Sequence, residues 1–245
     1  MIPWLMSIPW QHFRILSKTM AIDLSKVKGL CFDVDGTLSD TDDVWVAHLT
    51  HSLRVVRFLF KKSDPQPFAR WFVMATETPM NGMYHLLDHL SLDDNIANIY
   101  NKLMQKRKNS VRPFQLMNGA KELLELANAR YPMTVVSARD DASTRRFLDQ
   151  FELGGLFRAV VTNQTCEYTK PFPHPVRFAA NAMGLNAEEC IMIGDTTVDI
   201  LAGKTAGAQT VGLLCGFGEE KELRRAGADL ICKDLLELKE LFSGF

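Results

Sequence analysis

Short apolar segments alternate with segments of helical spacing along most of this chain, and this alternation limits the possible folds more than any other feature. Met133–Val136 is rich in β-favouring residues, and Gly119–Arg130 before it repeats its apolar residues at helical intervals. Short apolar strands that alternate with helices are typical of a parallel sheet covered on both faces. We therefore predict an α/β fold. The expected strands are Val27–Phe32, Met133–Val136, Ala159–Thr162, Ile191–Ile193, Thr210–Leu214 and Asp229–Cys232, and the expected helices are Gly119–Arg130, Ser143–Phe151, Pro175–Met183, Val198–Ala206 and Leu235–Phe242.

One long segment interrupts this alternation. Between Thr41 and Arg112 every periodic stretch is helical, and apolar residues recur at steps of three and four from Val46 to Phe60. We therefore expect residues 41–112 to form a separate helical cap. The cap would be inserted into a core made of residues 20–40 and 113–245.

The first nineteen residues fit neither of these units. Their first half is apolar, but Pro3 and Pro9 interrupt it, and it lacks the basic start of a signal peptide. The apolar run is also shorter than the roughly twenty residues that span a bilayer. We expect residues 1–19 to be an N-terminal extension before a domain that starts at Met20, and we expect no membrane span. Docking of this extension to a partner or a membrane surface is the alternative.

The composition argues against several classes of protein. The chain has 245 residues and a formal net charge of −1, so it lacks the basic footprint of a nucleic-acid-binding protein. Its five cysteines form no C-x-x-C pair and lie mostly in apolar runs. That pattern favours reduced thiols in a cytoplasmic protein over a disulfide framework or a cysteine zinc site. The sequence leaves the oligomeric state open.

Two acidic residues directly follow the first expected strand, in the motif DVDGT at residues 33–37. In extended backbone, residues two positions apart point the same way, so Asp33 and Asp35 can face one site. Gly36 lets the chain turn directly afterwards. Neighbouring carboxylates repel each other unless a cation or a functional demand offsets the repulsion. A functional site and an exposed acidic turn both remain possible for this motif taken alone.

A second acidic pair follows another apolar strand, in the motif GDTTVD at residues 194–199. Asp195 lies at the strand end, and Asp199 lies one helical turn further on. Hard carboxylate oxygens suit Mg²⁺, which takes one or two carboxylates and keeps several waters. A helix N-cap would account for one of these residues, but not for acidic residues at the ends of two strands.

Two single polar residues lie between these motifs. Ser137 closes the expected strand at Met133–Val136, and Lys170 precedes Pro171 after a polar loop. A hydroxyl and an ammonium are suited to bind phosphoryl oxygens. Taken alone, however, a serine after a strand is usually a cap and a lysine is usually solvated.

The order of these four features resembles the haloacid dehalogenase-like superfamily. The resemblance covers about residues 26–242 and is greatest to the phosphoglycolate phosphatase and β-phosphoglucomutase group, although the cap segment matches only in position and helical character. It implies a Rossmann-like parallel sheet core with an inserted α-helical cap domain. It also implies a role for each motif residue. Asp33 and Asp35 would be the catalytic residues. Mg²⁺ would be bound by Asp33, Asp195 and the backbone carbonyl of Asp35, with Asp199 in its outer shell. Ser137 and Lys170 would bind the phosphate.

The function implied is a Mg²⁺-dependent phosphatase that acts on a small phosphorylated metabolite through an aspartyl-phosphate on Asp33. Phosphoglycolate is the first candidate by resemblance, while a sugar phosphate, a nucleotide and pyrophosphate stay open. A phosphomutase would keep every motif and is one alternative. A non-enzymatic phosphate-binding protein is another, but it would be expected to lose a catalytic carboxylate, and Asp33, Asp35 and Asp195 are all present.

Overall fold

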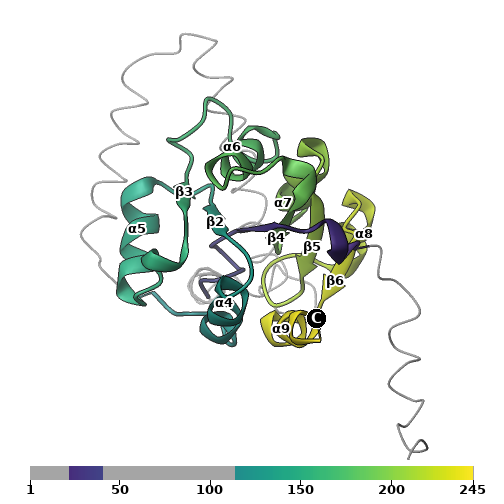
Figure 1. The fold of residues 1–245 in the computed structure, drawn as a ribbon, viewed down its shortest axis with the longest axis horizontal. Helices are drawn as coiled ribbons and strands as arrows, with labels where there is room; N and C mark the ends of the chain where they lie inside the picture. The colour runs from purple at the N-terminus through teal and green to yellow at the C-terminus, as the bar shows by residue number, and fades with distance from the viewer. Residues whose placement is uncertain (1–21, 41–113, 245) are drawn as a thin grey trace, which may run out of the picture.

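A computed structural model describes residues 22–40 and 114–244, which form a six-stranded parallel sheet with helices on both faces (Figure 1). The predicted α/β fold is therefore confirmed. The predicted N-terminal extension, residues 1–19, and the predicted helical cap, residues 41–112, lie outside the described residues. The domain boundaries stay predictions.

The sheet has the strand order β3-β2-β1-β4-β5-β6, which is the order of Rossmann-like folds. From β1 the chain builds one half of the sheet outward through β2 and β3, and then returns to β4 on the other side of β1. Ligand sites in open parallel sheets lie at the carboxyl ends of the strands beside this switch point. The strands are β1 Gly29–Phe32, β2 Met133–Val136, β3 Ala159–Val161, β4 Cys190–Gly194, β5 Gln209–Leu213 and β6 Leu230–Cys232.

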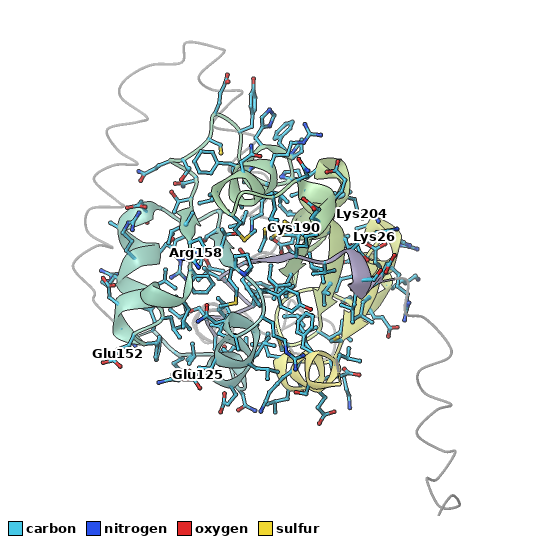
Figure 2. All side chains as sticks on the ribbon, viewed as in Figure 1. Lys26, Glu125, Glu152, Arg158, Cys190 and Lys204 are labelled. Carbon is cyan, nitrogen blue, oxygen red and sulfur yellow. The ribbon has the colours of Figure 1, made fainter. Side chains whose placement is uncertain are left out.

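Every residue of β1, β2 and β4 is buried, which explains why these strands are almost wholly apolar in sequence. One apolar layer joins α4 Ala120–Asn128, α5 Asp141–Gln150 and α9 Leu235–Ser243 to the sheet. A second joins α6 His174–Ala182 and α7 Thr197–Ala206 to the opposite face. Figure 2 shows the result: Glu125, Glu152 and Lys204 point outward, whereas Cys190 lies inside.

The expected elements are present, with ends that differ by one or two residues. The first strand begins at Gly29 rather than Val27, because the Val27 N–H closes the short 3₁₀ helix Leu24–Lys26. The helix α8 Glu220–Ala226 was not predicted. Leu223 is its single buried residue, so its sequence has no apolar periodicity to detect. Two further 3₁₀ helices are Gly154–Leu156 and Ala187–Glu189.

No helix in the described ranges, 22–40 and 114–244, has the length and apolar character needed to cross a bilayer.

The contact between α7 and the sheet gives a stability prediction. A Cβ added at Gly203 would lie 2.5 Å from Thr210 Cγ2 and 2.9 Å from Met192 Cβ, so Gly203 is what allows α7 to approach β4 and β5. Overpacking of this kind costs about 1–3 kcal/mol. We expect Gly203→Ala to lower the free energy of unfolding by that amount in urea titrations.

Gly155→Ala is the matched control, because a Cβ there meets nothing within 4 Å. Its free energy of unfolding should stay within about 0.5 kcal/mol of the unmodified chain. Equal stability of the two variants would contradict the close approach of α7.

Candidate active site

Polar side chains gather where the parallel strands end. Asp33 follows β1, Ser137 follows β2 and Asp195 follows β4, while Lys170 lies in the loop between β3 and α6. β1 and β4 are direct neighbours, with Phe32 opposite Ile193. Asp33 directly follows β1 and Asp195 directly follows β4, so both acidic residues lie at the same edge of the sheet. The carboxyl ends at the switch point therefore form a charged site.

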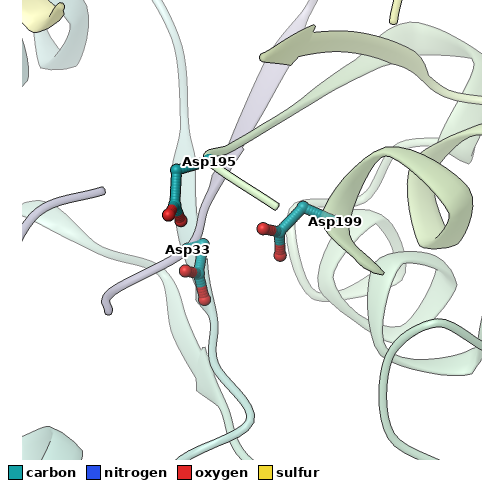
Figure 3. Close-up of side chains that lie close together, drawn as sticks. All are labelled: Asp33, Asp195 and Asp199. Carbon is teal, nitrogen blue, oxygen red and sulfur yellow. The ribbon is translucent and has the colours of Figure 1, made fainter. Parts of the chain in front are cut away.

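Asp33, Asp195 and Asp199 form a buried carboxylate cluster (Figure 3). One oxygen of each lies within 4.8 Å of the other two. The exposed fractions of the three residues are 5%, 0% and 1%. Buried carboxylates at this separation repel one another, and a hard divalent cation would offset the repulsion. The donor set, oxygen only and anionic, fits Mg²⁺.

Lys170 supplies a positive charge inside this cluster. Its Nζ donates to Asp33 Oδ1 at 2.5 Å and to Asp199 Oδ1 at 2.6 Å, and only 4% of the side chain is exposed. Burial disfavours the ammonium, but the Asp199 and Asp33 carboxylates outweigh burial and raise the pKa of Lys170 above its ordinary value. Lys170 is therefore a fixed cation beside the predicted nucleophile.

The ionisation of Asp33 depends on the cations around it. Burial raises the pKa of Asp33 to about 8; Lys170 opposes this rise, whereas the Asp199 and Asp35 charges add to it. A nucleophilic carboxylate has to be ionised. A divalent cation beside Asp33 would lower its pKa, because bound metal ions favour the ionised form of their ligands.

Close contacts with neighbouring backbone fix the position of the Asp195 carboxylate. Its Oδ2 accepts the Phe217 N–H at 2.8 Å, and its Oδ1 accepts from Thr37 Oγ1 at 3.2 Å. A Cβ at Gly36 or at Gly216 would overlap Oδ2. Glycine at position 36 of the DVDGT motif is therefore required for two reasons. Its φ is +75°, which disfavours other residues, and the Asp195 carboxylate occupies the place of a side chain.

Asp199 joins the start of α7 to Lys170. Its Oδ2 accepts the Thr196 N–H at 3.0 Å and the Thr196 Oγ1–H at 2.7 Å, which completes a capping box, while Oδ1 accepts from Lys170. Sequence analysis weighed a helix cap against a metal role for this residue. The structure shows the cap contact and also brings Asp199 into the carboxylate cluster.

Ser137 is held by a backbone contact at the end of β2. Its Oγ accepts the Arg139 N–H at 3.0 Å, and only 4% of the residue is exposed. Because the oxygen accepts from the backbone, its own hydrogen can point into the site. This arrangement suits a serine that donates to a phosphoryl oxygen.

Asp35 lies outside the carboxylate cluster, paired with Arg139. Arg139 Nε donates to Asp35 Oδ2 at 3.0 Å, and Arg139 Nη2 pairs with Asp35 Oδ1. The Asp35 side chain is 27% exposed, against 7% for Asp33. The prediction that the backbone carbonyl of Asp35 binds the metal stays a prediction.

Sequence analysis missed several residues that shape this site. Arg139 follows Ser137 by two positions, but that spacing does not show that its guanidinium pairs with Asp35, which follows the neighbouring strand β1. Gly216 and Phe217 have no role among the sequence predictions. Their actual contact, with Asp195, is long-range, and only the folded sheet reveals it.

Comparison with known proteins supports the same family. The haloacid dehalogenase-like hydrolase family matches residues 30–213. The pyrophosphatase PpaX of Bacillus velezensis is 29% identical over 77% of this chain and 83% of its own length. A hydrolase structure from Pseudomonas syringae has a TM-score of 0.68 at 26% identity, covering 89% of this chain and 99% of that one. A predicted phosphoglycolate phosphatase from Haemophilus somnus has a TM-score of 0.63 at 19% identity, covering 88% and 98%.

These matches confirm the enzyme class expected from the sequence, a hydrolase of the phosphatase type. The match covers the first five strands of the sheet. The chain therefore belongs to the haloacid dehalogenase-like hydrolases.

Proposed function

We propose that this chain is a Mg²⁺-dependent phosphatase that hydrolyses a small phosphorylated molecule through an aspartyl-phosphate on Asp33. One observation carries the proposal. Asp33 Oδ1 accepts from the ammonium of Lys170 at 2.5 Å, and a carboxylate oxygen of Asp33 lies within 4.8 Å of one oxygen each of Asp195 and Asp199. A carboxylate nucleophile can approach an anionic phosphoryl group only if positive charge offsets their repulsion. Lys170 supplies one such charge, and the carboxylates could hold another.

Asp33, Asp195 and the backbone carbonyl of Asp35 would hold Mg²⁺, with Asp199 in its outer shell. When bound, the ion would offset negative charge on the nucleophile and the phosphoryl oxygens. Lys170 and Ser137 would bind phosphoryl oxygens on the other side. Lys170 already stands at hydrogen-bond distance from the attacking carboxylate.

The reaction would take place in two steps. In the first, an oxygen of Asp33 bonds to phosphorus, the bond to the leaving oxygen breaks, and Asp35 gives that oxygen a proton. In the second, Asp35 takes a proton from water, the water oxygen bonds to phosphorus, and the bond from phosphorus to Asp33 breaks. Asp33 is regenerated and phosphate leaves.

One substrate has support from the comparisons, since the PpaX relatives are named as pyrophosphatases. The predicted phosphoglycolate phosphatase, at 19% identity, is similar in fold alone, and phosphoglycolate stays a candidate from the resemblance of the sequence. The likeness to a putative β-phosphoglucomutase from Thermotoga maritima, at 18% identity, bears on the fold alone. A cytoplasmic location is part of the proposal, supported by five cysteines that form no disulfide in the described residues.

The first experiment is a phosphate-release screen over phosphoglycolate, pyrophosphate, sugar phosphates and nucleotides with Mg²⁺ present. We expect free phosphate to be the main product from at least one small substrate. If a sugar phosphate isomerises faster than phosphate appears, the chain is a mutase and the proposal is wrong.

Replacement of the nucleophile tests the covalent intermediate. Asp33→Asn keeps the size of the side chain but cannot form an acyl phosphate, so we expect phosphate release to fall by at least about 10⁴-fold on every substrate. Circular dichroism should show an unchanged fold. Substantial activity of Asp33→Asn on any phosphate ester would argue against attack by this residue.

Removal of the metal tests the carboxylate cluster. We expect activity to disappear with a chelator, to return with Mg²⁺, and to return poorly with Ca²⁺, which prefers more ligands and a looser geometry. The control is the same titration monitored by thermal unfolding, in which Mg²⁺ should raise the melting temperature. Full turnover in the presence of chelator would show that the cluster serves another purpose.

A further inference from the structure

Arg139 is held more firmly than an ordinary surface arginine. Its guanidinium contacts both oxygens of Asp35 through Nε and Nη2, and it lies over the Phe114 ring at 5.0 Å from the centroid. Its backbone N–H is bonded to Ser137 Oγ. Only 12% of the side chain is exposed. Arg139 therefore links the predicted phosphate-binding serine to the predicted acid–base aspartate.

One end of this guanidinium is unsatisfied. Nη1 is buried, and it has no hydrogen-bond partner within residues 22–40 and 114–244. Buried guanidinium N–H groups are normally paired, and leaving a buried donor unpaired is costly. Nη1 belongs to the same rigid plane as the two nitrogens that hold Asp35, but it lies on the other edge of the guanidinium, so its N–H groups are not used by Asp35.

The pair with Arg139 also restrains Asp35. Both carboxylate oxygens accept from the guanidinium, which is the fork-to-fork geometry of a strong ion pair. In the proposed mechanism one of these oxygens has to reach the leaving oxygen of the substrate. The pair has to open, or shift, before Asp35 can serve there.

We propose that Arg139 is a specificity-determining residue that binds a second anionic group of the substrate and, in exchange for it, releases Asp35 for proton transfer; this inference rests on the proposed phosphatase function. The fork that now holds the Asp35 carboxylate fits a substrate carboxylate or a second phosphoryl group equally well. Nη1 adds a donor that Asp35 does not use. A substrate without a second anion would leave Asp35 paired.

The charges make this exchange reasonable. Arg139 gives up one carboxylate and receives another anion, so the buried guanidinium is never left without a negative partner. The pair is also the more accessible part of the site: its side chains are 12% and 27% exposed, against 4% and 7% for Lys170 and Asp33. An anionic group of the substrate can therefore reach Arg139 without displacing the inner cluster.

The test compares two substrates that differ in the second group. Phosphoglycolate carries a carboxylate where 2-hydroxyethyl phosphate carries a neutral hydroxyl. We expect kcat/KM to favour phosphoglycolate by about 10- to 100-fold, the range for hydrogen bonds to charged groups. In Arg139→Lys and Arg139→Ala this preference should fall to within about threefold, because phosphoglycolate loses more of its kcat/KM than 2-hydroxyethyl phosphate does.

Arg146→Ala is the matched control. Arg146 also lies over the Phe114 ring, at 5.2 Å, but it is exposed and belongs to α5. Its substrate preference should match that of the unmodified chain. If Arg139→Ala keeps the preference, or if both substrates lose activity equally, Arg139 is only a structural partner of Asp35 and the inference is overturned.

A binding measurement separates this inference from the proposed function. Calorimetry with the Asp33→Asn chain and Mg²⁺ should show phosphoglycolate binding that Arg139→Lys weakens about tenfold, with no change for 2-hydroxyethyl phosphate. Equal affinities for the two ligands would overturn the role of Arg139 even if phosphatase activity is intact. Conversely, turnover that persists without Asp33 would overturn the phosphatase mechanism while the Arg139 contrast in binding stands.

Discussion

The rest of the site depends on the two ion pairs that the Lys170 ammonium forms with Asp33 and Asp199. The ammonium lies between Asp33 and Asp199, and all three side chains are at least nine-tenths buried. Removing one partner of a buried ion pair costs about 3–5 kcal/mol, because the remaining charge has no counterion. The end of β1, the loop before α6 and the first turn of α7 are thus tied together by one cation. The proposed nucleophile, Asp33, is positioned by the same contact that stabilises these three segments.

The site has an inner and an outer level of charge. The inner level, formed by Lys170 and the three clustered aspartates, is almost closed to solvent. The outer level is the pair of Asp35 and Arg139, which is partly exposed. Groups that must keep a fixed geometry through the reaction belong at the inner level, since rigid, preorganised charges stabilise a transition state best. A proton-transfer group has to move between partners, and the more accessible pair suits that task.

Local patterns were sufficient to predict the α/β fold and the strand ends at which Asp33 and Asp195 lie. Wholly apolar runs such as Cys190–Gly194 predict central strands, and an aspartate directly after two such runs predicts a charged strand edge. The strand order was not predicted, because local patterns do not show which strands are neighbours. The helix α8 was missed because it buries only Leu223.

Contacts across the sheet could not be predicted at all from local patterns. Arg139 and Asp35 are 104 positions apart, and the Phe217 N–H and Asp195 are 22 apart, so neither pair leaves a periodic signal. Local patterns do not identify the substrate either. Residues 41–112 are outside the described ranges, and their assignment as a cap stays a prediction.

The topology itself explains why a catalytic charge cluster forms at this point. β1 and β4 are parallel neighbours, so the backbone brings the residues that directly follow them to the same edge of the sheet, whatever their charge. Aspartate at both positions is unfavourable for stability alone, because two buried carboxylates repel each other. Gly36 and Gly216 then remove the side chains that would keep Asp195 away. The chain thus brings like charges together by its backbone and keeps them there through Lys170 and polar backbone contacts. A fold optimised only for stability would carry apolar residues at these strand ends; a site that has to bring a carboxylate and a cation to one phosphoryl group requires the charges.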